Sequence, residues 1–188
     1  MKQRPILFSG PMVRALLDGS KTQTRRVAKA KHLSWIEGSV LNFLDGKWNQ
    51  RPLPYGKTGD QLWVREGWRT FMELDKVAPK NIPAGTSVWY DAQDDVPFHP
   101  SCFGKGRPSI HMPRWASRIT LEITGVRVER LHDITRGDAM AEGCPFPNMA
   151  DGDDPRKWYS DLWNSINGTD SWDLNPWVWV IEFKAVKP

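Results

Sequence analysis

The fold of this chain is constrained most by short segments in which every second residue is apolar. The clearest is 118–124, where isoleucine and leucine alternate with arginine, threonine and glutamate. Because successive side chains of a strand point to opposite faces of a sheet, this pattern predicts a strand with one buried face. Gly125 interrupts the pattern, and apolar residues resume in 126–131. We therefore expect a second strand there, after a bulge or a turn.

Several other short segments are also expected to be strands. They comprise residues 5–8, 22–27, 61–66, 87–90 and 177–186. In 61–66, Leu62 and Val64 share one face, whereas Trp63 and Arg65 share the other. Residues 28–60 are expected to be irregular, because glycine and proline recur along them.

Three short helices are expected between these strands. The first begins near Pro11, which suits the first turn of a helix, and ends at Gly19. The second begins with the spacing of a capping box at Thr135 and Asp138. The third, 155–166, has an amphipathic pattern. Strands separated by short helices and long excursions indicate an α+β fold, built on a small mixed or closed sheet.

The 188 residues suit one domain. No run of about 18 apolar residues is present, so no membrane span is expected, and the first residues do not resemble a signal peptide. Cys102 and Cys144 are too few for a disulfide scaffold. They favour a reducing, cytoplasmic compartment.

The net charge of +4 is distributed unevenly along the chain. Residues 1–69 contain 13 lysines and arginines against 5 acidic residues, a net charge of +8. Residues 70–188 contain 13 against 17, a net charge of −4. The basic part is suited to gathering phosphates, although a solvated surface would have the same composition.

Residues 19–26 concentrate side chains that suit an anion site or a nucleophile. Arg25 and Arg26 offer planar guanidinium groups to a phosphate or carboxylate, and Lys21 offers a compact charge. Lys21 would also serve as a base for the Thr24 hydroxyl if burial or nearby cations lowered its pKa. The alternative is the exposed polar edge of a strand.

Two carboxylates are further candidates. Glu66 follows Arg65 at the end of an apolar strand, and alone this pair favours a surface ion pair. Glu142 lies in the last turn of the second expected helix, where the helix dipole disfavours a carboxylate. Such an anion is often paired with a cation or used for acid–base chemistry, and the alternative is an exposed glutamate.

Residues 109–115 contain a third group of candidates. His111, Arg114 and Trp115 combine a titratable ring, a cation and a stacking plane. Together they suit a nucleobase and its phosphate. The alternative is a loop held by the packing of Trp115.

No metal or cofactor is expected. His99 and Cys102 are close in sequence and Cys144 is available to join them, but paired CxxC or HExxH spacings are absent. Walker and GxGxxG phosphate loops are absent as well.

Taken together, these motifs resemble the ASCH domain, a small β-barrel family related to the PUA fold. Gly19, Lys21 and Arg26 match its Gly-x-Lys-x-x-x-x-Arg motif. Three further stretches match in the expected order, namely 59–66, 134–143 and 178–184.

The resemblance implies one domain over 1–188, a small PUA-like β-barrel with short flanking helices. Long loop insertions are then expected at about 28–58, 67–113 and 144–173. Residues 109–115 also resemble the phage and prophage branch of the family. That branch implies a bacterial cytoplasmic setting, host-encoded or phage-encoded.

A narrower resemblance suggests a reaction. ASCH amidohydrolases that act on acetylcytidine use a lysine, a threonine and a glutamate at the positions of Lys21, Thr24 and Glu142. Lys21 would take the proton of Thr24, Thr24 would attack an amide carbonyl, and Glu142 would protonate the leaving amine. Arg26 or Arg65 would steady the substrate. Lys21 must then precede the strand or be separated from Thr24 by a bulge, because residues three apart in a strand face opposite sides.

Three functions are consistent with the sequence. The first is hydrolysis of an amide on a modified nucleoside or of an RNA linkage, and the second is non-catalytic binding of RNA or a nucleotide. The third is a phage accessory protein that docks a protein partner through its insertions. Exposed tryptophans among the 11 of the chain would favour the third.

Overall fold

The computed structural model describes residues 1–28, 33–36, 39–44, 47–51, 53–93, 102–145 and 154–186, of which 33–51 are described by backbone alone. The fold is α+β, with much sheet and few helices. The main sheet has five strands, which are, in spatial order, β1 (Gln3–Leu7), β6 (Gln61–Arg65), β9 (Thr120–Arg130), β10 (Trp177–Val186) and β2 (Gln23–Val27). β1 and β6 are parallel, and the other neighbours are antiparallel.

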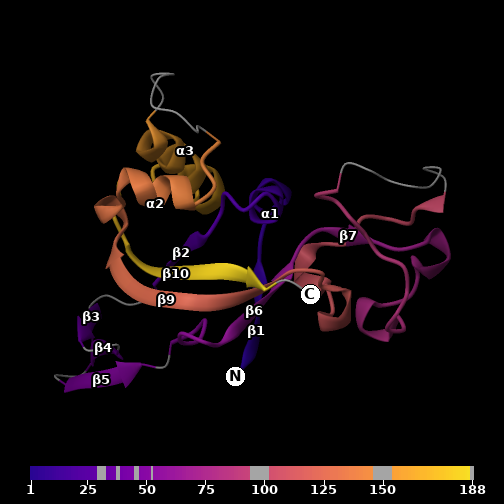
Figure 1. The fold of residues 1–188 in the computed structure, drawn as a ribbon, viewed down its shortest axis with the longest axis horizontal. Coiled ribbons are helices and arrows are strands. Elements are labelled where there is room, and N and C mark those ends of the chain that lie inside the picture. The colour runs from indigo at the N-terminus through magenta and orange to yellow at the C-terminus, as the bar shows by residue number, and fades with distance from the viewer. Residues whose placement is uncertain are drawn as a thin grey trace.

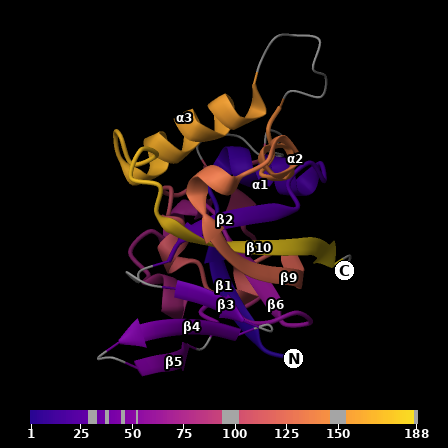
Figure 2. The same ribbon diagram turned by 90° about the vertical axis from the view of Figure 1, so that its left-hand side faces the viewer.

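Three helices lie beside the β2 edge of the sheet. They are α1 (Gly10–Leu17), α2 (Arg136–Ala141) and α3 (Pro155–Asn167). In Figures 1 and 2, α2 and α3 lie on the side of β2 and β10 opposite to β3–β5. The capping box expected for α2 is confirmed, since Thr135 accepts from the Asp138 amide and Asp138 accepts from the Thr135 amide. Pro11 occupies the first turn of α1 as expected.

The interruption at Gly125 is a bulge. β9 runs unbroken, but its register against β10 shifts at one point. Glu182 lies opposite Gly125 and Phe183 lies opposite Ile123, so Thr124 is the extra residue. A β-bulge adds local twist and bends its strand, and β9 is drawn as a bent ribbon (Figure 1).

Alternating residues of β10 pack into two cores on its two faces. Ile181 and Trp179 belong to the main core together with apolar residues of β1, α1, β6 and β9. Val178 and Val180 face a second core, formed with residues of α2 and α3. β10 is therefore buried on both sides, which explains its nearly continuous apolar sequence.

The segment after β6 forms a lobe with its own small core. It contains β7 (Trp68–Arg69), β8 (Trp89–Tyr90) and the short 3-10 helices Met72–Leu74, Pro79–Asn81, Ser109–His111 and Arg114–Ala116. Trp68, Met112 and Ala116 are buried there. Another 3-10 helix, Leu131–Asp133, links β9 to α2.

The expectation that residues 28–60 are irregular is wrong. They contain a three-stranded antiparallel sheet of β3 (Leu33–Ile36), β4 (Ser39–Leu44) and β5 (Lys47–Arg51). The glycines and prolines that suggested irregular structure lie between or after these strands. Short hairpin strands are compatible with frequent glycine because glycine is used in the turns.

The two edge strands of the main sheet approach each other without a backbone ladder. Within the described residues no strand pairing joins β1 to β2, so closure into a barrel is not shown. A side chain bridges the edges instead, because the Arg26 guanidinium donates to the Leu7 carbonyl over 2.6 Å. None of the helices in the described ranges is long and apolar enough to cross a membrane.

Candidate functional site

The turn after α1 brings Lys21 against the end of α2. Gly19, with φ of +83°, makes this turn, a conformation that costs glycine little. Lys21 precedes β2 and forms an isolated antiparallel bridge with Glu142. Lys21 therefore precedes the strand that contains Thr24, which is one of the two arrangements that the expected reaction requires.

A buried ion pair joins Lys21 and Glu142. The Lys21 ammonium donates to Glu142 Oε2 over 2.7 Å and to the Glu142 carbonyl over 2.9 Å. Their side chains are 0% and 2% exposed, so the pair is shielded from water. Burial lowers the pKa of Lys21, because the charged form loses its hydration, and the Glu142 carboxylate opposes that shift. The negative end of α2 tolerates Glu142 because cations surround it.

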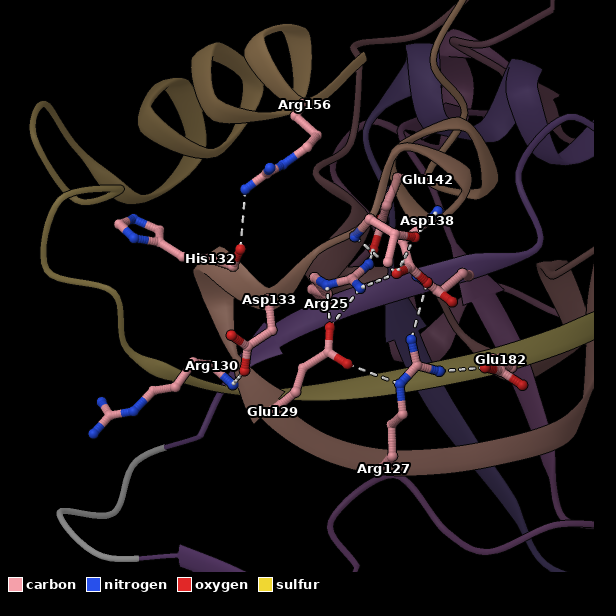
Figure 3. Close-up of polar contacts among 12 residues, drawn as sticks. Arg25, Arg127, Glu129, Arg130, His132, Asp133, Asp138, Glu142, Arg156 and Glu182 are labelled. Atoms are coloured by element: carbon pink, nitrogen blue, oxygen red, sulfur yellow. Dashed lines mark hydrogen bonds and ion pairs between the residues drawn. The ribbon is translucent and has the colours of Figure 1, made fainter. Parts of the chain in front are cut away.

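Arg25 provides the second cation. Its Nη1 donates to Glu142 Oε1 over 3.2 Å, so each oxygen of Glu142 faces a different positive group. The same guanidinium donates to Glu129 over 2.6 Å and 3.1 Å. The Arg25 side chain is fully buried and is held from both sides by carboxylates (Figure 3).

A further layer of charges fixes this arrangement. Arg127 pairs with Glu129 over 2.8 Å, with Asp138 over 3.0 Å and also with Glu182 (Figure 3). Burial alone would raise the pKa of Asp138, but hydrogen bonds from Thr135 and Gln23 and the nearby Arg25 lower it. Alternate residues of β9 thus face the site, as the period of a strand requires.

A small cavity of about 50 Å³ opens beside this network. Its walls come from α1, β2, the end of α2 and α3, and the lining residues are Met12, Thr24, Arg25, Arg26, Val27, Glu142, Tyr159, Leu162, Trp163, Ile166 and Asn167. Thr24 is one of these lining residues and is 3% exposed. Lys21 is not among the lining residues, so Glu142 stands between its ammonium and the cavity.

Tyr159 links α3 to the charged network. The Arg25 guanidinium lies 5.9 Å from the centre of the Tyr159 ring. Burial raises the pKa of Tyr159 well above its usual value, so this phenol stays protonated at neutral pH. α3 therefore contributes an aromatic, uncharged wall opposite the charged side chains of Arg25 and Glu142.

Of the remaining candidates, Arg26 reaches the same region. It lines the cavity and lies 5.3 Å from the Phe8 ring centre. Arg65 instead lies on Trp63, 4.6 Å from the ring centre, and Arg114 lies 5.8 Å from the same ring. Trp63, itself a candidate substrate-binding residue, is 8% exposed, and both guanidinium groups lie near its ring.

Glu66, His111 and Trp115 are placed apart from the cavity lining. Glu66 is 1% exposed and accepts two hydrogen bonds from Arg118, each 3.0 Å long. This is a buried pair rather than the expected surface pair. Trp115 packs against the core of the lobe after β6, and His111 is exposed at the end of a 3-10 helix. Arg65 donates to the Ile110 carbonyl and so ties that loop to β6.

Sequence reasoning missed the residues that surround the Lys21–Glu142–Arg25 cluster. Glu129 and Arg127 are two residues apart in β9, and this alternation of charge in a strand was a readable signal. Trp163 was expected only as an apolar position of the amphipathic helix 155–166, and Tyr159 was not singled out. Their approach to Arg25 depends on how α3 packs, which the sequence pattern does not specify.

Metal-ligand clusters are not seen in the described ranges: no group of three or more histidine, cysteine or acidic residues there is arranged to hold an ion. Cys102 and Cys144 form no disulfide. His99, which was considered with them, lies outside the described residues.

Comparison with known proteins leaves the family open. No protein-family model matches this chain, and no curated protein matches it. A solved structure of a protein from Enterococcus faecalis V583, described by the family model DUF984, is similar with a TM-score of 0.43 and 10% sequence identity. The match covers 99% of this chain and 80% of that chain. This degree of similarity decides neither family nor function.

Proposed function

We propose that the cavity beside Glu142 binds a nucleoside or a nucleotide of RNA and hydrolyses an amide on it. The proposal includes an ASCH-type fold with a PUA-like barrel. Support for the barrel comes from the Arg26 contact to Leu7, which brings the two sheet edges together, and from the bulge that bends β9. The order of the matching motifs along the chain supports the family.

One observation carries the proposed chemistry. Thr24, which carries a hydroxyl, lines the same cavity as Glu142, the carboxylate of a buried lysine–glutamate pair. A nucleophile needs a nearby group that accepts its proton, and a leaving amine needs a group that returns one. Thr24 and the Lys21–Glu142 pair provide both functions.

The steps balance as follows. Thr24 Oγ attacks the amide carbonyl and forms a C–O bond, while its proton passes to the Lys21–Glu142 pair. The pair then gives that proton to the amide nitrogen as the C–N bond breaks, and the amine leaves. A water molecule then attacks the acyl-threonine carbonyl and gives a proton to the pair. The pair returns a proton to Thr24 Oγ as the C–O bond to threonine breaks, and the acid leaves. Because the two groups are 2.7 Å apart and strongly coupled, the proton belongs to the pair rather than to one residue.

The charges around the cavity suit a polar substrate. Arg26 lines the cavity and offers a cation for the substrate or for the oxyanion of the tetrahedral intermediate. With about 50 Å³, the cavity holds only a few waters, so a nucleobase enters when side chains of α3 move aside. Among the apolar lining residues of α3, Ile166 is 52% exposed, whereas Tyr159 and Trp163 are buried.

The direct test compares hydrolysis of acetylcytidine, free and within a short RNA, by wild type and two threonine variants. Thr24→Val preserves volume and removes the hydroxyl, and we expect kcat to fall at least about 100-fold. Thr22→Val is the matched control, because Thr22 is exposed two residues away, and it should change kcat less than about 2-fold. Turnover equal in all three proteins would refute Thr24 as nucleophile.

Binding without turnover would favour the non-catalytic reader. In that case acetylcytidine or RNA binds the wild type, Thr24→Val alters affinity alone, and no deacetylated product forms. If neither binding nor turnover is observed, a nucleoside is excluded as the ligand of this cavity.

Docking of a protein partner is not favoured by the tryptophans that can be placed. Trp158, Trp163 and Trp172, from the insertion at 144–173, pack in or against the core under α3. The side chains of Trp35 and Trp48 lie outside the described residues. The phage accessory function therefore stays an alternative without an observation that favours it.

A further inference from the structure

We propose that a second, basic cleft beside β1 binds a phosphate group carried by a nucleotide or by an RNA strand. The cleft has a volume of about 380 Å³. It lies between the start of β1 and the turn before β6, and it is lined by Met1, Lys2, Arg4, Leu53, Gly56, Lys57 and Asp60. It shares no lining residue with the cavity beside Glu142, so it is a separate site.

The size of the cleft suits a ligand larger than a water cluster. Small-molecule sites in proteins usually measure about 300–1,000 Å³ and combine apolar walls with a few fixed polar groups. Leu53 and Met1 supply the apolar part, and the charged residues supply the polar part.

The described lining is strongly positive. Lys2, Arg4 and Lys57 face a single carboxylate, Asp60. Within the described residues Lys2 and Lys57 form no side-chain ion pair, whereas Arg4 pairs with Asp60. Concave surfaces lined by one sign of charge concentrate counter-ions, and three cations around one carboxylate favour an anionic ligand.

Asp60 accepts hydrogen bonds from each of the three residues that carry these cations. It accepts from the Lys2 amide over 2.9 Å, from Arg4 Nη1 over 3.0 Å and from the Lys57 amide over 3.4 Å. These bonds lower the pKa of Asp60 to about 2, the Lys2 amide contributing most, so it stays ionised. Among the described residues, Nη1 is the Arg4 nitrogen that is bonded to a side chain, and the Arg4 side chain is 30% exposed. The rest of the guanidinium is available to a ligand.

A glycine allows the turn to approach Arg4 closely. Gly56 has φ of +111°, and a Cβ atom there would lie 2.6 Å from Arg4 Nη1 and 3.0 Å from Asp60 Oδ2. The Arg4 guanidinium is therefore held in place by backbone geometry as well as by Asp60, and Asp60 also fixes the backbone of Lys2 and Lys57. A preorganised cluster binds an anion without first having to order its side chains.

Phosphate fits these features best. An arginine fork and two lysines on one small surface match an oxyanion with several oxygens and a high charge. Free nucleotide and RNA backbone present the same group, so the experiment separates them. Inorganic phosphate, AMP and a ten-residue single-stranded RNA without a terminal phosphate are titrated into the full chain by calorimetry or anisotropy, at two salt concentrations.

The test variant is Lys2→Ala/Lys57→Ala, and the control is Lys76→Ala/Lys80→Ala, which removes two exposed lysines from the lobe after β6. We expect the test variant to weaken binding about 10-fold or more and to reduce the slope of log K against log salt concentration by about 1–2. The control variant should weaken binding less than about 2-fold. Both variants remove exposed side chains, so unchanged thermal unfolding checks the fold.

The outcomes separate cleanly. If AMP or phosphate binds the wild type and the test variant loses this binding, the ligand is a free nucleotide. If only the RNA binds, the ligand is an RNA strand. Equal losses in both double variants, or no binding of any probe, overturn the site. Acetylcytidine turnover is measured on the same proteins, and it should not change, because the cleft is separate from Thr24.

Discussion

Glu142 occupies a position that a carboxylate normally avoids. It caps the C-terminal end of α2, where the dipole disfavours negative charge, and yet it is buried. Lys21 and Arg25 make this possible, since each oxygen of Glu142 receives a cation. A buried charge with partners is tolerable, whereas the same charge left alone is costly. The three side chains therefore form one electrostatic unit.

Removing different members of this unit should have unequal effects. Glu142→Gln leaves Lys21 and Arg25 buried with less opposite charge, and we expect the free energy of unfolding to fall by about 3–5 kcal/mol. Lys21→Met leaves Glu142 paired with Arg25 and fills the same space, so a smaller loss is expected. Urea denaturation of both variants gives the comparison.

A surface pair provides the control for that experiment. Lys157 and Asp161 are bonded over 2.8 Å but their side chains are 72% and 63% exposed. Lys157→Met should change the free energy of unfolding by less than about 0.5 kcal/mol. A Glu142→Gln variant as stable as Lys157→Met would contradict the electrostatic unit.

The sequence could predict Glu142 as a candidate but not its surroundings. Motif resemblance placed Lys21, Thr24 and Glu142 in one site, and the structure brings the first and third into contact. Nothing in the local pattern showed that Arg25, next to Thr24, would point to the same carboxylate. Side chains at successive strand positions face opposite sides, and yet Thr24 and Arg25 both line the cavity at the edge strand β2, together with residues of α3.

At the scale of elements, α2 depends on how it begins and ends. Its capping box was readable from the sequence because it is a local pattern with a fixed spacing. Its C-terminal turn was only partly readable. Gly143 has φ of +95°, and the turn lies against α1 and the segment that holds Lys21.

Gly143→Ala should therefore destabilise the protein. A Cβ atom at Gly143 would lie 3.0 Å from Ala15 Cβ and 3.3 Å from Lys21 Cβ, in a backbone conformation that alanine rarely adopts. We expect a loss of about 1–3 kcal/mol in the free energy of unfolding. Because the turn positions Lys21, turnover of acetylcytidine should fall as well.

Gly137 offers the matched control within the same helix. A Cβ atom there would meet nothing closer than Thr135 Oγ1 at 3.8 Å. Alanine has a higher helix propensity than glycine, so Gly137→Ala should stabilise by about 0.5–1 kcal/mol. Opposite signs for the two glycine substitutions in urea denaturation are the expected result, and equal signs would contradict it.

Among the strands, prediction succeeded where one face is buried and failed in 28–60. Residues 61–65 and 177–186 form strands as expected, because their apolar residues pack into the cores. β3, β4 and β5 lie in segments interrupted by glycine and proline, and they pair mainly with each other. A small separate sheet gives a weaker periodic signal than a central strand does, since less of it is constrained by the main core.

For the whole molecule, the sequence indicated the α+β class but not how the parts meet. Alternation of short helices and strands is a property of the chain, and it was read correctly. The packing of α3 over β2, which shapes the cavity, is a contact between segments more than 100 residues apart. The approach of Arg26 to Leu7 at the sheet edges and the meeting of β1 with the turn at Asp60 also join segments distant in sequence, with separations of 19 and 58 residues. Such contacts follow from global packing.

Stability against acid should report on the carboxylates that join distant parts of the chain. Asp60 ties β1 to the turn before β6, and its pKa is lowered from 3.8 to about 2. Asp138 ties α2 to β2 and β9, and its pKa is lowered too. A carboxylate whose pKa is lower in the folded state binds fewer protons there than in the unfolded state.

The stabilisation from these groups is therefore complete above about pH 4, the unfolded value, and is lost as the pH falls toward 2. Urea midpoints measured from pH 7 to pH 2.5 should stay level and then drop. Asp60→Asn should lower the midpoint at pH 7 and flatten the drop, because the group that titrates differently between the two states has been removed. Asp173→Asn, at an exposed aspartate, should leave the profile of the wild type unchanged. A drop of the same size in Asp60→Asn as in Asp173→Asn would show that Asp60 does not link β1 to the turn at low pH.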